Sequence, residues 1–400
     1  MYPLLWGYYR KLFTLEILRV CIMKIRKICY VVTIPTTIRS FFMSQLQYLA
    51  KHGFDVSVIC ARDEKLLEDI GNGIHYIPVD IPRGISFWGS IRAVKELINT
   101  FKREKFDLIQ YSTPNAALYA SIAAKIVGCK IRNYHLMGFR YLGAHGVGKS
   151  ILKTIEKVSC WNSTSIECVS RSNLEFGIKE KIFPVDKATV VWNGSTGGVD
   201  LDRFDYSKRD VWRNKLREEL GYEDADFIYG FVGRITRDKG INELLEAFFE
   251  LKDDSKLFLI GNVEDENTLD KKLWMKAKNH PNIQIHTAVS DIERYFAMID
   301  VLVLPSYREG FGNVVIEAAA VGTPAIVSNI PGPIDTIDAG KTALTVEVKN
   351  ADDLKAKMAI MRGGIHNDMA QNAVCFVRNN FDSDKLCEKI HERKRFLLGE

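Results

Sequence analysis

Short runs of apolar residues alternate with longer amphipathic stretches along most of this chain. A short apolar run bounded by glycine, proline or aspartate predicts a strand buried on both faces, and the stretches between such runs predict helices. Regular alternation of this kind is typical of a doubly wound α/β sheet with parallel strands. The expected strands are 28–34, 55–60, 74–79, 107–111, 130–134, 167–170 and 189–192, followed by 227–232, 257–260, 283–286, 301–304, 325–327 and 343–346.

The alternation is interrupted at residues 193–210, which are rich in Gly, Asp and Ser and predict an interdomain linker. A chain of 400 residues is also too long for a single hydrophobic core. We therefore predict an N-terminal Rossmann-like domain over residues 27–195 and a C-terminal one over 196–378, with a cleft between them. A long, charged helix is expected after Asp382, within residues 379–400.

An extension of residues 1–26 precedes the first strand and combines aromatic with basic side chains. Its apolar run is interrupted by Glu16 and Arg19, so it does not predict a membrane-spanning helix. Two interpretations stay open. Either the extension is an anchor that lies in the membrane interface, or synthesis of the protein begins at Met23.

The chemistry of the chain centres on residues 305–318, with the sequence PSYREGFGNVVIEA. This stretch follows the apolar run 301–304 and leads into good helix formers, so it predicts a strand, a glycine-punctuated loop and a helix start. Ligands of open α/β sheets bind at the carboxyl ends of strands, where loop N–H groups and a helix N-terminus attract anions. Glu309 and Glu317 flank this anion site, and carboxylates accept hydrogen bonds from sugar hydroxyls. A phosphate and a polyol in one ligand indicate a nucleotide sugar.

A second basic loop follows the first strand of the C-terminal domain. Its sequence is GRITRDKG, over residues 233–240, and a helix is expected from Ile241 onward. Arg234 and Lys239 are placed to reach over the N-terminus of that helix and clamp a diphosphate.

Residues 143–150, GAHGVGKS, fit the phosphate-binding P-loop pattern residue for residue. That pattern requires a buried strand directly before it, whereas the preceding segment is short and interrupted by Gly138 and Arg140. We favour a surface loop that leads into a basic, membrane-facing helix. A nucleotide-dependent P-loop enzyme that uses Lys149 is kept as an alternative.

Candidates for the acceptor side of the cleft lie near the ends of expected strands of the N-terminal domain. His135 and Gly138 follow the strand 130–134 and are therefore expected on the cleft side. A lone histidine is more often structural than catalytic. The full set of acceptor-side candidates is Thr36, Thr37, Arg39, His135, Gly138 and Arg140.

Composition narrows the classes of function. The chain is 46% hydrophobic and 26% charged, and its net charge of +5 fits an anionic ligand or a membrane surface without requiring nucleic acid. Its eight cysteines include no C-x-x-C pair, which indicates a reducing compartment and argues against a zinc site or a disulfide framework. No G-x-G-x-x-G follows the first strand, so a dinucleotide-dependent oxidoreductase is not expected.

These motifs together resemble the retaining family-4 glycosyltransferases of the GT-B fold. The spacing of Glu309 and Glu317 is similar to that family's E-x7-E motif, and the resemblance covers nearly the whole chain after Lys24. Residues 192–204 resemble the G-S-x-x-G-V-D linker of a bacterial subgroup that builds capsule, exopolysaccharide or lipid-linked oligosaccharides. The motifs are specific for the family but do not identify the sugar.

The resemblance implies a role for each motif. Arg234 and Lys239 would hold the donor diphosphate and Glu309 the donor sugar, and these three would carry the catalysis. Glu317 would bind the ribose. The implied donor-binding residues are Gly233, Arg234, Lys239, Glu309, Gly310, Phe311, Gly312, Asn313, Val314 and Glu317.

The chain departs from the family at one position. Many members carry His-Gly where this chain has Met137-Gly138, so the sugar-contacting histidine of the family is absent at that position. The resemblance also implies that the last helix packs back onto the N-terminal domain.

The expected activity is transfer, with retention, of a hexose or N-acetylhexosamine from a UDP-linked donor. The expected acceptor is an oligosaccharide or a polyprenyl-diphosphate-linked saccharide, reached by a cytoplasmic protein bound peripherally to the inner membrane. No metal is expected, because the negative charge on the leaving phosphate is met by Arg234, Lys239 and a helix N-terminus. No cofactor and no nucleic acid are expected either. A GT-B epimerase and a non-catalytic sugar-nucleotide-binding subunit are further alternatives.

Overall fold

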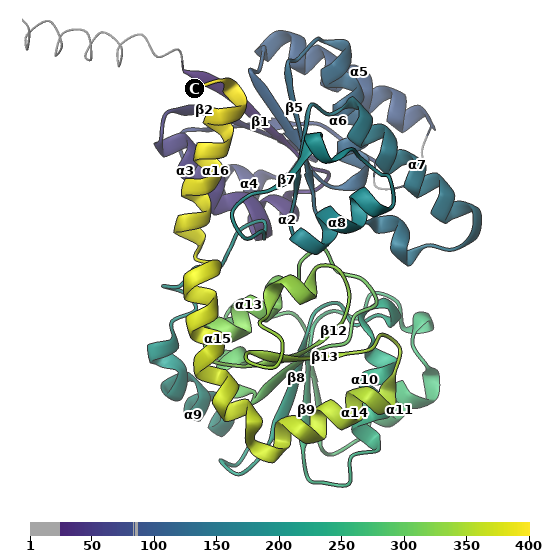
Figure 1. The fold of residues 1–400 in the computed structure, drawn as a ribbon, viewed down its shortest axis with the longest axis vertical. Helices are drawn as coiled ribbons and strands as arrows, with labels where there is room; N and C mark the ends of the chain where they lie inside the picture. Colours follow the sequence, from purple (N-terminus) through teal and green to yellow (C-terminus); the bar gives the residue numbers. More distant parts are fainter. Residues whose placement is uncertain (1–24, 83, 85–86) are drawn as a thin grey trace, which may run out of the picture.

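The structure, a computed structural model, describes residues 25–400 apart from 83, 85 and 86. Two α/β domains are stacked end to end, and the chain crosses between them twice (Figure 1). Most of the N-terminal extension lies outside the described residues, so the predictions of an interfacial anchor and of a start at Met23 are untested.

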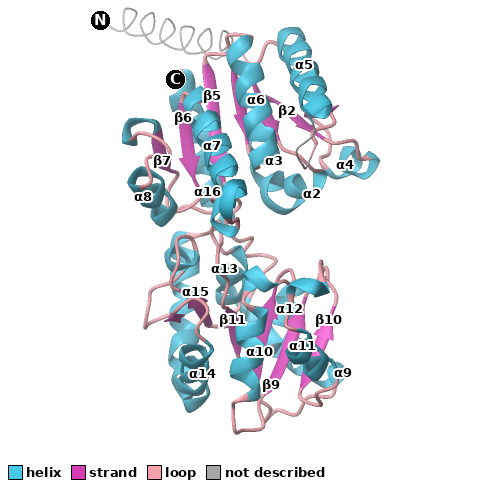
Figure 2. Ribbon diagram, turned by 90° about the vertical axis from the view of Figure 1, so that its right-hand side faces the viewer, coloured by secondary structure: helices cyan, strands magenta, loops and turns pink. Residues whose placement is uncertain are grey.

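The N-terminal domain is built on a parallel sheet of seven strands in the order β3-β2-β1-β4-β5-β6-β7. Helices cover both faces of the sheet (Figure 2). Its strands are β1 (Arg26–Val31), β2 (Phe54–Cys60), β3 (Ile74–Pro78), β4 (Leu108–Tyr111), β5 (Ile131–Leu136), β6 (Ser165–Cys168) and β7 (Ala188–Val190). Its α-helices are α2 (Pro35–Thr37), α3 (Met43–Lys51), α4 (Glu64–Asp69), α5 (Phe87–Glu104), α6 (Pro114–Ile126), α7 (Gly146–Asn162) and α8 (Arg171–Lys179).

The C-terminal domain repeats this plan with six parallel strands in the order β10-β9-β8-β11-β12-β13. Its strands are β8 (Ile228–Val232), β9 (Lys256–Ile260), β10 (Ile283–His286), β11 (Val301–Leu304), β12 (Ala325–Ser328) and β13 (Ala343–Val346). Its helices are α9 (Arg209–Leu220), α10 (Ile241–Phe249), α11 (Lys271–Lys278), α12 (Ile292–Met298), α13 (Asn313–Ala320), α14 (Ala351–Ile360), α15 (His366–Asn380) and α16 (Ser383–Leu398).

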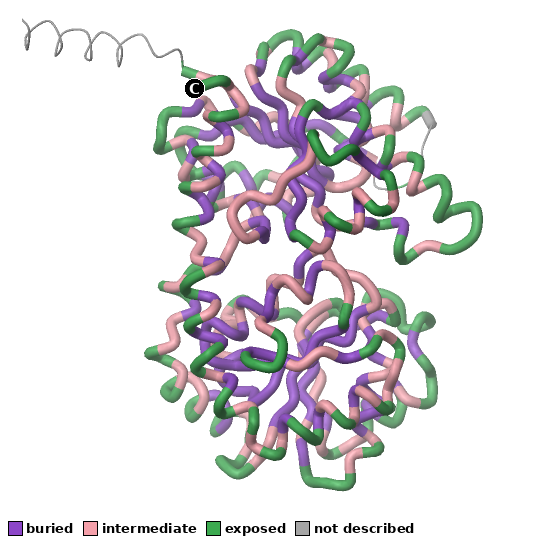
Figure 3. The backbone as a smooth tube through the Cα atoms, in the orientation of Figure 1, coloured by how far each residue is buried: buried purple, intermediate pink, exposed green. Residues whose placement is uncertain are grey.

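The apolar runs of the sequence form the interiors of the two sheets, where buried positions concentrate (Figure 3). Every residue of β4, β6, β11 and β12 is buried, as expected for parallel strands covered by helices on both faces. The strands expected from the sequence are thereby confirmed, with small shifts at their ends. The largest shift is in the first strand, which ends at Val31 because a loop leads from there to Pro35, where α2 begins.

The linker expected at 193–210 is shorter than predicted. Asp205 accepts a hydrogen bond from the backbone of Ser207 and starts a short 3-10 turn, and α9 begins directly afterwards, at Arg209. The two crossings between the domains are hydrogen-bonded to each other. Val199 N–H donates to the carbonyl of Phe381 at 2.7 Å, and Ser383 N–H donates to the carbonyl of Val199 at 2.9 Å.

The last helix, α16, returns to the N-terminal domain and packs against α3 (Figure 1). It carries Lys394, which is fully buried and donates to both carboxylate oxygens of Glu167, at 2.7 and 3.0 Å, and to Gln110 at 2.6 Å. Removing one partner of a buried ion pair costs roughly 3–5 kcal/mol, because the other charge is left without compensation. This pair therefore fixes the end of the chain on the N-terminal domain.

Candidate active site

Two adjoining pockets lie between the domains, with volumes of about 460 and 350 Å³. Both are lined by residues from each domain, so they form one cleft. Residues shared by the two pockets are Phe41 and Met137 from the N-terminal domain and Arg234, Lys239, Glu309 and Gly310 from the C-terminal domain. We call the larger the upper pocket and the smaller the lower pocket.

The loop 305–312 follows the buried strand β11 and ends at Gly312, the N-cap of α13. Gly312 has a φ of 102°, in the left-handed region that glycine adopts without steric cost. This turn directs the chain from the sheet edge into α13, and the loop lines the lower pocket. The residues of this stretch that line the lower pocket are Glu309, Gly310, Phe311, Gly312, Asn313 and Val314.

Lys239 and Glu309 form an ion pair on the C-terminal side of the cleft. The Lys239 ammonium donates to Glu309 Oε1 at 2.5 Å, and the Ser306 hydroxyl donates to the same oxygen at 2.9 Å. Both charged side chains are only 14% exposed. A cation and a carboxylate are thus held side by side where both pockets meet.

The loop that carries Lys239 is packed directly on the loop that carries Glu309. Tyr307 N–H donates to the carbonyl of Asp238 at 2.9 Å, and the Arg308 guanidinium pairs with the Asp238 carboxylate at 2.8 Å. At Gly240, with a φ of 74°, a Cβ would lie 2.1 Å from the carbonyl oxygen of Pro305. Only glycine allows this close approach, and the approach fixes the spacing of the two charges.

Arg234 stands at the edge of the same site and is more open to solvent. It lines both pockets, its side chain is 47% exposed, and it pairs with Glu264 at 2.7 Å. Burial lowers the pKa of this guanidinium, but the hydrogen bond to Glu264 and the charges of Glu264, Asp238 and Glu309 outweigh it and raise the pKa overall. Arg234 and Lys239 are the predicted diphosphate-binding cations, and the structure brings them together with Gly233 and Glu309.

Glu317 lies in α13 but does not line either cleft pocket. Burial raises the pKa of its carboxyl to about 7, while the nearby Arg203 guanidinium lowers that pKa and the Glu293 carboxylate raises it. Arg203 itself pairs with Glu293 at 2.9 Å and belongs to the segment that leads out of the linker. Glu317 is therefore the predicted donor residue that stands apart from the others.

The acceptor-side candidates divide into two groups. Thr37, Gly138 and Arg140 line the upper pocket, whereas Thr36, Arg39 and His135 do not. Arg39 forms ion pairs with Asp63, at 2.9 Å, and with Asp69.

His135 lies inside the N-terminal domain, within β5. Its Nε2 is 3.1 Å from the Thr196 hydroxyl of the linker, and its ring packs edge-on against Phe42. Burial lowers the pKa of His135 to about 4; Glu167 raises that pKa and Lys394 lowers it. His135 is thus buried against the linker and lines neither cleft pocket.

Several residues of the upper pocket had not been singled out from the sequence. Thr113 precedes Pro114 at the start of α6, and this helix-start pattern is the one feature of the sequence that could have pointed to it. In the structure Thr113 has a φ of 66°, which is uncommon for a residue other than glycine. The remainder were not recognisable because they carry no motif of their own. These lining residues are Phe41, Thr113, Pro114, Tyr134 and Phe139.

The P-loop-like stretch lies at the surface, as predicted, but it is only partly a loop, because residues 146–150 already belong to α7. Strand β5 ends at Leu136, a 3-10 turn spans Arg140–Gly143, and α7 begins at Gly146, so no strand directly precedes the pattern. Lys149 is exposed in the first turn of α7. Lys153, one turn further, is paired with Glu180 at 2.7 Å.

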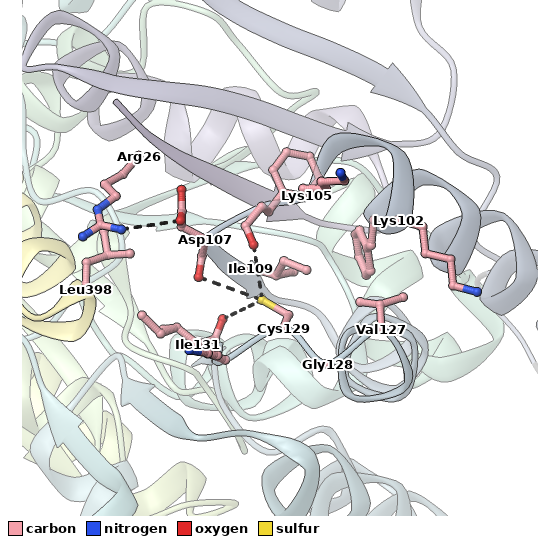
Figure 4. Close-up of a pocket in the computed structure, with 13 residues that line it drawn as sticks. Arg26, Lys102, Lys105, Asp107, Ile109, Val127, Gly128, Cys129, Ile131 and Leu398 are labelled. Atoms are coloured by element: carbon pink, nitrogen blue, oxygen red, sulfur yellow. Dashed lines mark hydrogen bonds and ion pairs between the residues drawn. The ribbon is translucent and has the colours of Figure 1, made fainter. Parts of the chain in front are cut away.

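A larger pocket, of about 700 Å³, lies at the N-terminal ends of β1, β4 and β5, at the end of the N-terminal sheet that faces away from the cleft (Figure 4). Arg26 pairs with Asp107 at 3.6 Å beside it, and Lys102 projects away from it. Its lysines stand at or just beyond the C-terminal ends of α5 and α6, where cations complement the helix dipole. The charges of this pocket are explained by the fold, and the pocket is far from the predicted motifs.

Two kinds of feature are absent from the described part of the chain. Residues 25–400, without 83, 85 and 86, contain no group of three or more His, Cys, Asp or Glu side chains arranged to hold a metal ion. Within the same residues, no helix combines the length and the apolar character needed to span a membrane.

Comparison with known proteins agrees with this geometry. The family model "Glycosyl transferase 4-like" matches residues 27–170, and the model "Glycosyl transferases group 1" matches residues 213–373. The capsular polysaccharide biosynthesis glycosyltransferase CapM of Staphylococcus aureus is 31% identical over 385 residues, which cover 94% of this chain and 99% of CapM. The UDP-Gal:α-D-GlcNAc-diphosphoundecaprenol α-1,3-galactosyltransferase of Escherichia coli is 24% identical over 379 residues, covering 92% and 96% of the two chains.

Solved structures confirm the fold. A glycosyltransferase from Rickettsia africae superimposes with a TM-score of 0.75 at 21% identity, covering 94% of this chain and 99% of that one. Anabaena HepE in complex with UDP-glucose superimposes with a TM-score of 0.73 at 18% identity, covering 92% and 98%. The predicted GT-B fold, with two Rossmann-like domains across a cleft, is therefore confirmed.

Proposed function

The chain belongs to the group 1 glycosyltransferases, and we propose that it transfers a hexose or N-acetylhexosamine from a UDP-linked donor to a polyprenyl-diphosphate-linked saccharide. We further propose that the anomeric configuration of the sugar is retained and that the product enters a bacterial surface polysaccharide. The observation that carries the proposal is the Lys239–Glu309 pair at 2.5 Å, with Arg234 beside it in the cleft. Cations suit the diphosphate of such a donor, and the carboxylate suits its sugar hydroxyls.

The proposed UDP-linked donor is supported by a sequence relative and by a solved structure. The E. coli relative is named for UDP-galactose, and HepE was solved with UDP-glucose. In our proposal Gly310, Phe311 and Gly312 offer backbone groups to the donor sugar, and the N-terminus of α13 adds to the positive potential around the diphosphate.

Charge decides the mechanism we propose. As the bond between sugar and diphosphate breaks, negative charge develops on the leaving oxygen and positive charge on the sugar ring. Lys239 and Arg234 stabilise the leaving group, and this stabilisation counts most where water is excluded. Glu309 is the only carboxylate among the described residues that line the two pockets, and it already accepts hydrogen bonds from Lys239 and Ser306. It therefore orients the sugar rather than attacking it.

Retention follows in this proposal if the acceptor hydroxyl approaches from the face that the diphosphate leaves, with a diphosphate oxygen taking its proton. The acceptor then occupies the upper pocket, between Thr37, Gly138 and Arg140. No metal is required for this charge scheme. Turnover that persists in EDTA would support it, and activity that is lost in EDTA and restored by Mg²⁺ or Mn²⁺ would contradict it.

Arg140 lines the upper pocket, and the chain leads from it through a 3-10 turn into α7, whose first turns form an exposed rim. Val147 and Ile151 share one face of α7 and are 76% and 44% exposed, and Lys149 is exposed on the opposite side of this helix. A helix with exposed apolar residues on one face and cations on the other favours the interface of an anionic membrane. We propose that the protein binds peripherally at the cytoplasmic face of the membrane with this rim.

The direct test offers a panel of radiolabelled nucleotide sugars to the purified protein, with and without a membrane extract that supplies lipid-linked acceptors. One UDP-sugar should label the lipid fraction, and NMR of the product should show the donor's anomeric configuration. Conversion of the UDP-sugar without any acceptor would indicate an epimerase. Binding of a UDP-sugar without any conversion would indicate a non-catalytic subunit.

A further inference from the structure

The N-terminus of α8 makes a further connection between the domains, separate from the two chain crossings that meet at Val199. We propose that Asn173 and Ser172, at this helix start, are positioning residues that hold the donor loop in its closed arrangement through Gly310 and Asp335. The inference rests on the proposed function only in assigning loop 305–312 to the donor. The contacts themselves are independent of which sugar is bound.

Asn173 makes the more deeply buried of the two sets of hydrogen bonds that form this connection. Its side chain is 1% exposed, and its amide donates to the carbonyl oxygen of Gly310 at 2.5 Å. The same amide nitrogen is 2.7 Å from the hydroxyl of Ser170, the N-cap of α8, which fixes the amide's direction. Gly310 directly follows Glu309, so this bond sets the position of the peptide next to the cleft carboxylate.

Ser172 makes the other set, which involves the charged carboxylate of Asp335. Its backbone N–H donates to Asp335 Oδ2 at 3.1 Å, its hydroxyl contacts the same oxygen, and Gly332 N–H donates to that hydroxyl at 2.8 Å. Asp335 thus places a carboxylate of the C-terminal domain at the N-terminus of a helix of the N-terminal domain, where a negative charge is favoured. Hydrogen bonds to a charged group are stronger than neutral ones.

Backbone segments around these bonds approach one another too closely to admit a side chain at three glycines. A Cβ on Gly310 would lie 2.0 Å from the carbonyl oxygen of Met137, and one on Gly332 would lie 2.8 Å from the carbonyl oxygen of Gly310. A Cβ on Gly138 would lie 2.7 Å from the Cα of Gly310. Segments from both domains therefore meet backbone to backbone at Gly310, and α8 supplies the polar contacts that hold them.

Each of these hydrogen bonds joins one domain to the other. We therefore expect them to stabilise this closed arrangement of the cleft over any arrangement in which the domains stand further apart. Loss of the contacts should therefore lower the fraction of enzyme in which Glu309 and Lys239 face the acceptor pocket. Affinity for UDP should change little, since the proposed diphosphate cations belong to the C-terminal domain alone.

Asp335→Ala is the cleanest test, because the side-chain hydrogen bonds that the structure gives this residue all go to Ser172. We expect kcat for sugar transfer to fall about tenfold or more, the scale of a charge-assisted hydrogen bond. The dissociation constant for UDP should stay within about threefold, and Asp335→Asn, which keeps an acceptor oxygen, should recover part of the rate. Asn173→Ala should lower kcat about fivefold, as for a neutral hydrogen bond.

Asp338→Ala is the matched control, since its carboxylate pairs with Lys341 of its own domain at 2.9 Å. Small-angle X-ray scattering of the ligand-free proteins reports closure directly. Wild type and Asp338→Ala should have the radius of gyration of the closed structure, and Asp335→Ala should have a larger one. Unchanged kcat and an unchanged radius of gyration in Asp335→Ala would overturn the proposal.

A merely structural role gives a different pattern: a lowered melting temperature and a smaller active fraction, with an unchanged radius of gyration of the folded molecules. That result in both Asp335→Ala and Asn173→Ala would also overturn the proposal. The scattering measurement needs neither sugar nor acceptor, so it tests the connection even if no donor is transferred. Absence of transfer in the wild type would instead contradict the proposed function.

Discussion

The two faces of the cleft differ in the kinds of chemical group that line them. The C-terminal face presents fixed charges from two loops that each follow a strand, and Lys239, Glu309 and Arg308 are tied into ion pairs there. The N-terminal face presents mainly backbone, hydroxyl and apolar groups. Arg140 is its only charged residue among the described residues that line the two pockets.

This difference indicates a division of labour. Charges held in place before the ligand arrives suit a donor whose leaving group gains charge during the reaction, since they need no reorganisation. A face of backbone and small side chains recognises its ligand by shape and a few hydrogen bonds. Substitutions of charged residues on the C-terminal face should therefore affect the rate, and those on the N-terminal face should affect acceptor affinity.

The sharpest separation is expected from Lys239→Ala. This change removes a cation that we propose to bind the leaving group, and it leaves Glu309 without its ion-pair partner. We expect kcat/KM to fall on the order of 10²-fold or more, the scale of losing one preorganised group that meets a developing charge. Steady-state transfer assays measure it, and a loss of less than about fivefold would contradict the charge scheme.

Glu309→Gln should give the next largest loss of activity. The substitution keeps the shape of the side chain and removes its charge, so the sugar is held more weakly where its bond breaks. We expect kcat to fall about 10- to 100-fold, with a smaller change in the affinity for UDP, which lacks the sugar. Comparing calorimetric binding of UDP and of UDP-sugar separates the two effects. Equal weakening of both ligands would instead assign Glu309 to the diphosphate.

The contrast between the faces also explains what the sequence could predict. Lys239 and Glu309 were recognisable because each lies in a loop directly after an apolar run, and a strand end fixes where such a loop points. Arg39 and His135 stand near strand ends as well, but their directions depend on partners elsewhere. Arg39 is drawn to Asp63 and Asp69, and His135 faces the linker.

The contacts between the domains could not be predicted from the sequence either, because they too depend on partners far away in the chain. Ser172 and Asp335 are 163 residues apart in the chain, and no local pattern marks either of them. The strands were predicted nearly to the residue because burial on both faces leaves a local apolar signal. The linker end was predicted less well, because the turn that precedes Arg209 depends on a single capping side chain, Asp205.

Glu317 should give a smaller effect that depends on pH. Burial raises the pKa of its carboxyl to about 7, above the ordinary value of 4.5, so it binds a proton as the pH falls through 7. If the charged form accepts hydrogen bonds from the donor ribose, affinity for UDP should weaken several-fold between pH 8 and about 6. Glu317→Gln should weaken UDP binding at pH 8 and remove this pH dependence.

The same shift predicts the sign of a stability change. A carboxyl whose pKa is raised in the folded protein favours folding below its ordinary pKa, and that contribution is lost as the pH rises toward 7. The free energy of unfolding of Glu317→Gln should therefore gain on that of the wild type between about pH 4.5 and 7. Urea titrations at several pH values measure this, and parallel pH profiles for the two proteins would contradict the assignment.

The smallest effects are expected on the N-terminal face. Arg140→Ala should raise KM for the lipid-linked acceptor a few-fold while kcat and UDP affinity stay near wild type, because an exposed cation contributes little through water. Lys149→Ala should leave transfer to a soluble acceptor within a few-fold and weaken binding to anionic vesicles by about 1 kcal/mol, the contribution of one cation near such a surface. Titration of UDP and ATP against Lys149→Ala and Lys239→Ala, with vesicle sedimentation in parallel, measures both. Tight ATP binding that vanishes with Lys149 and ignores Lys239 would reverse the division between the faces, because the working cation would then belong to the N-terminal domain.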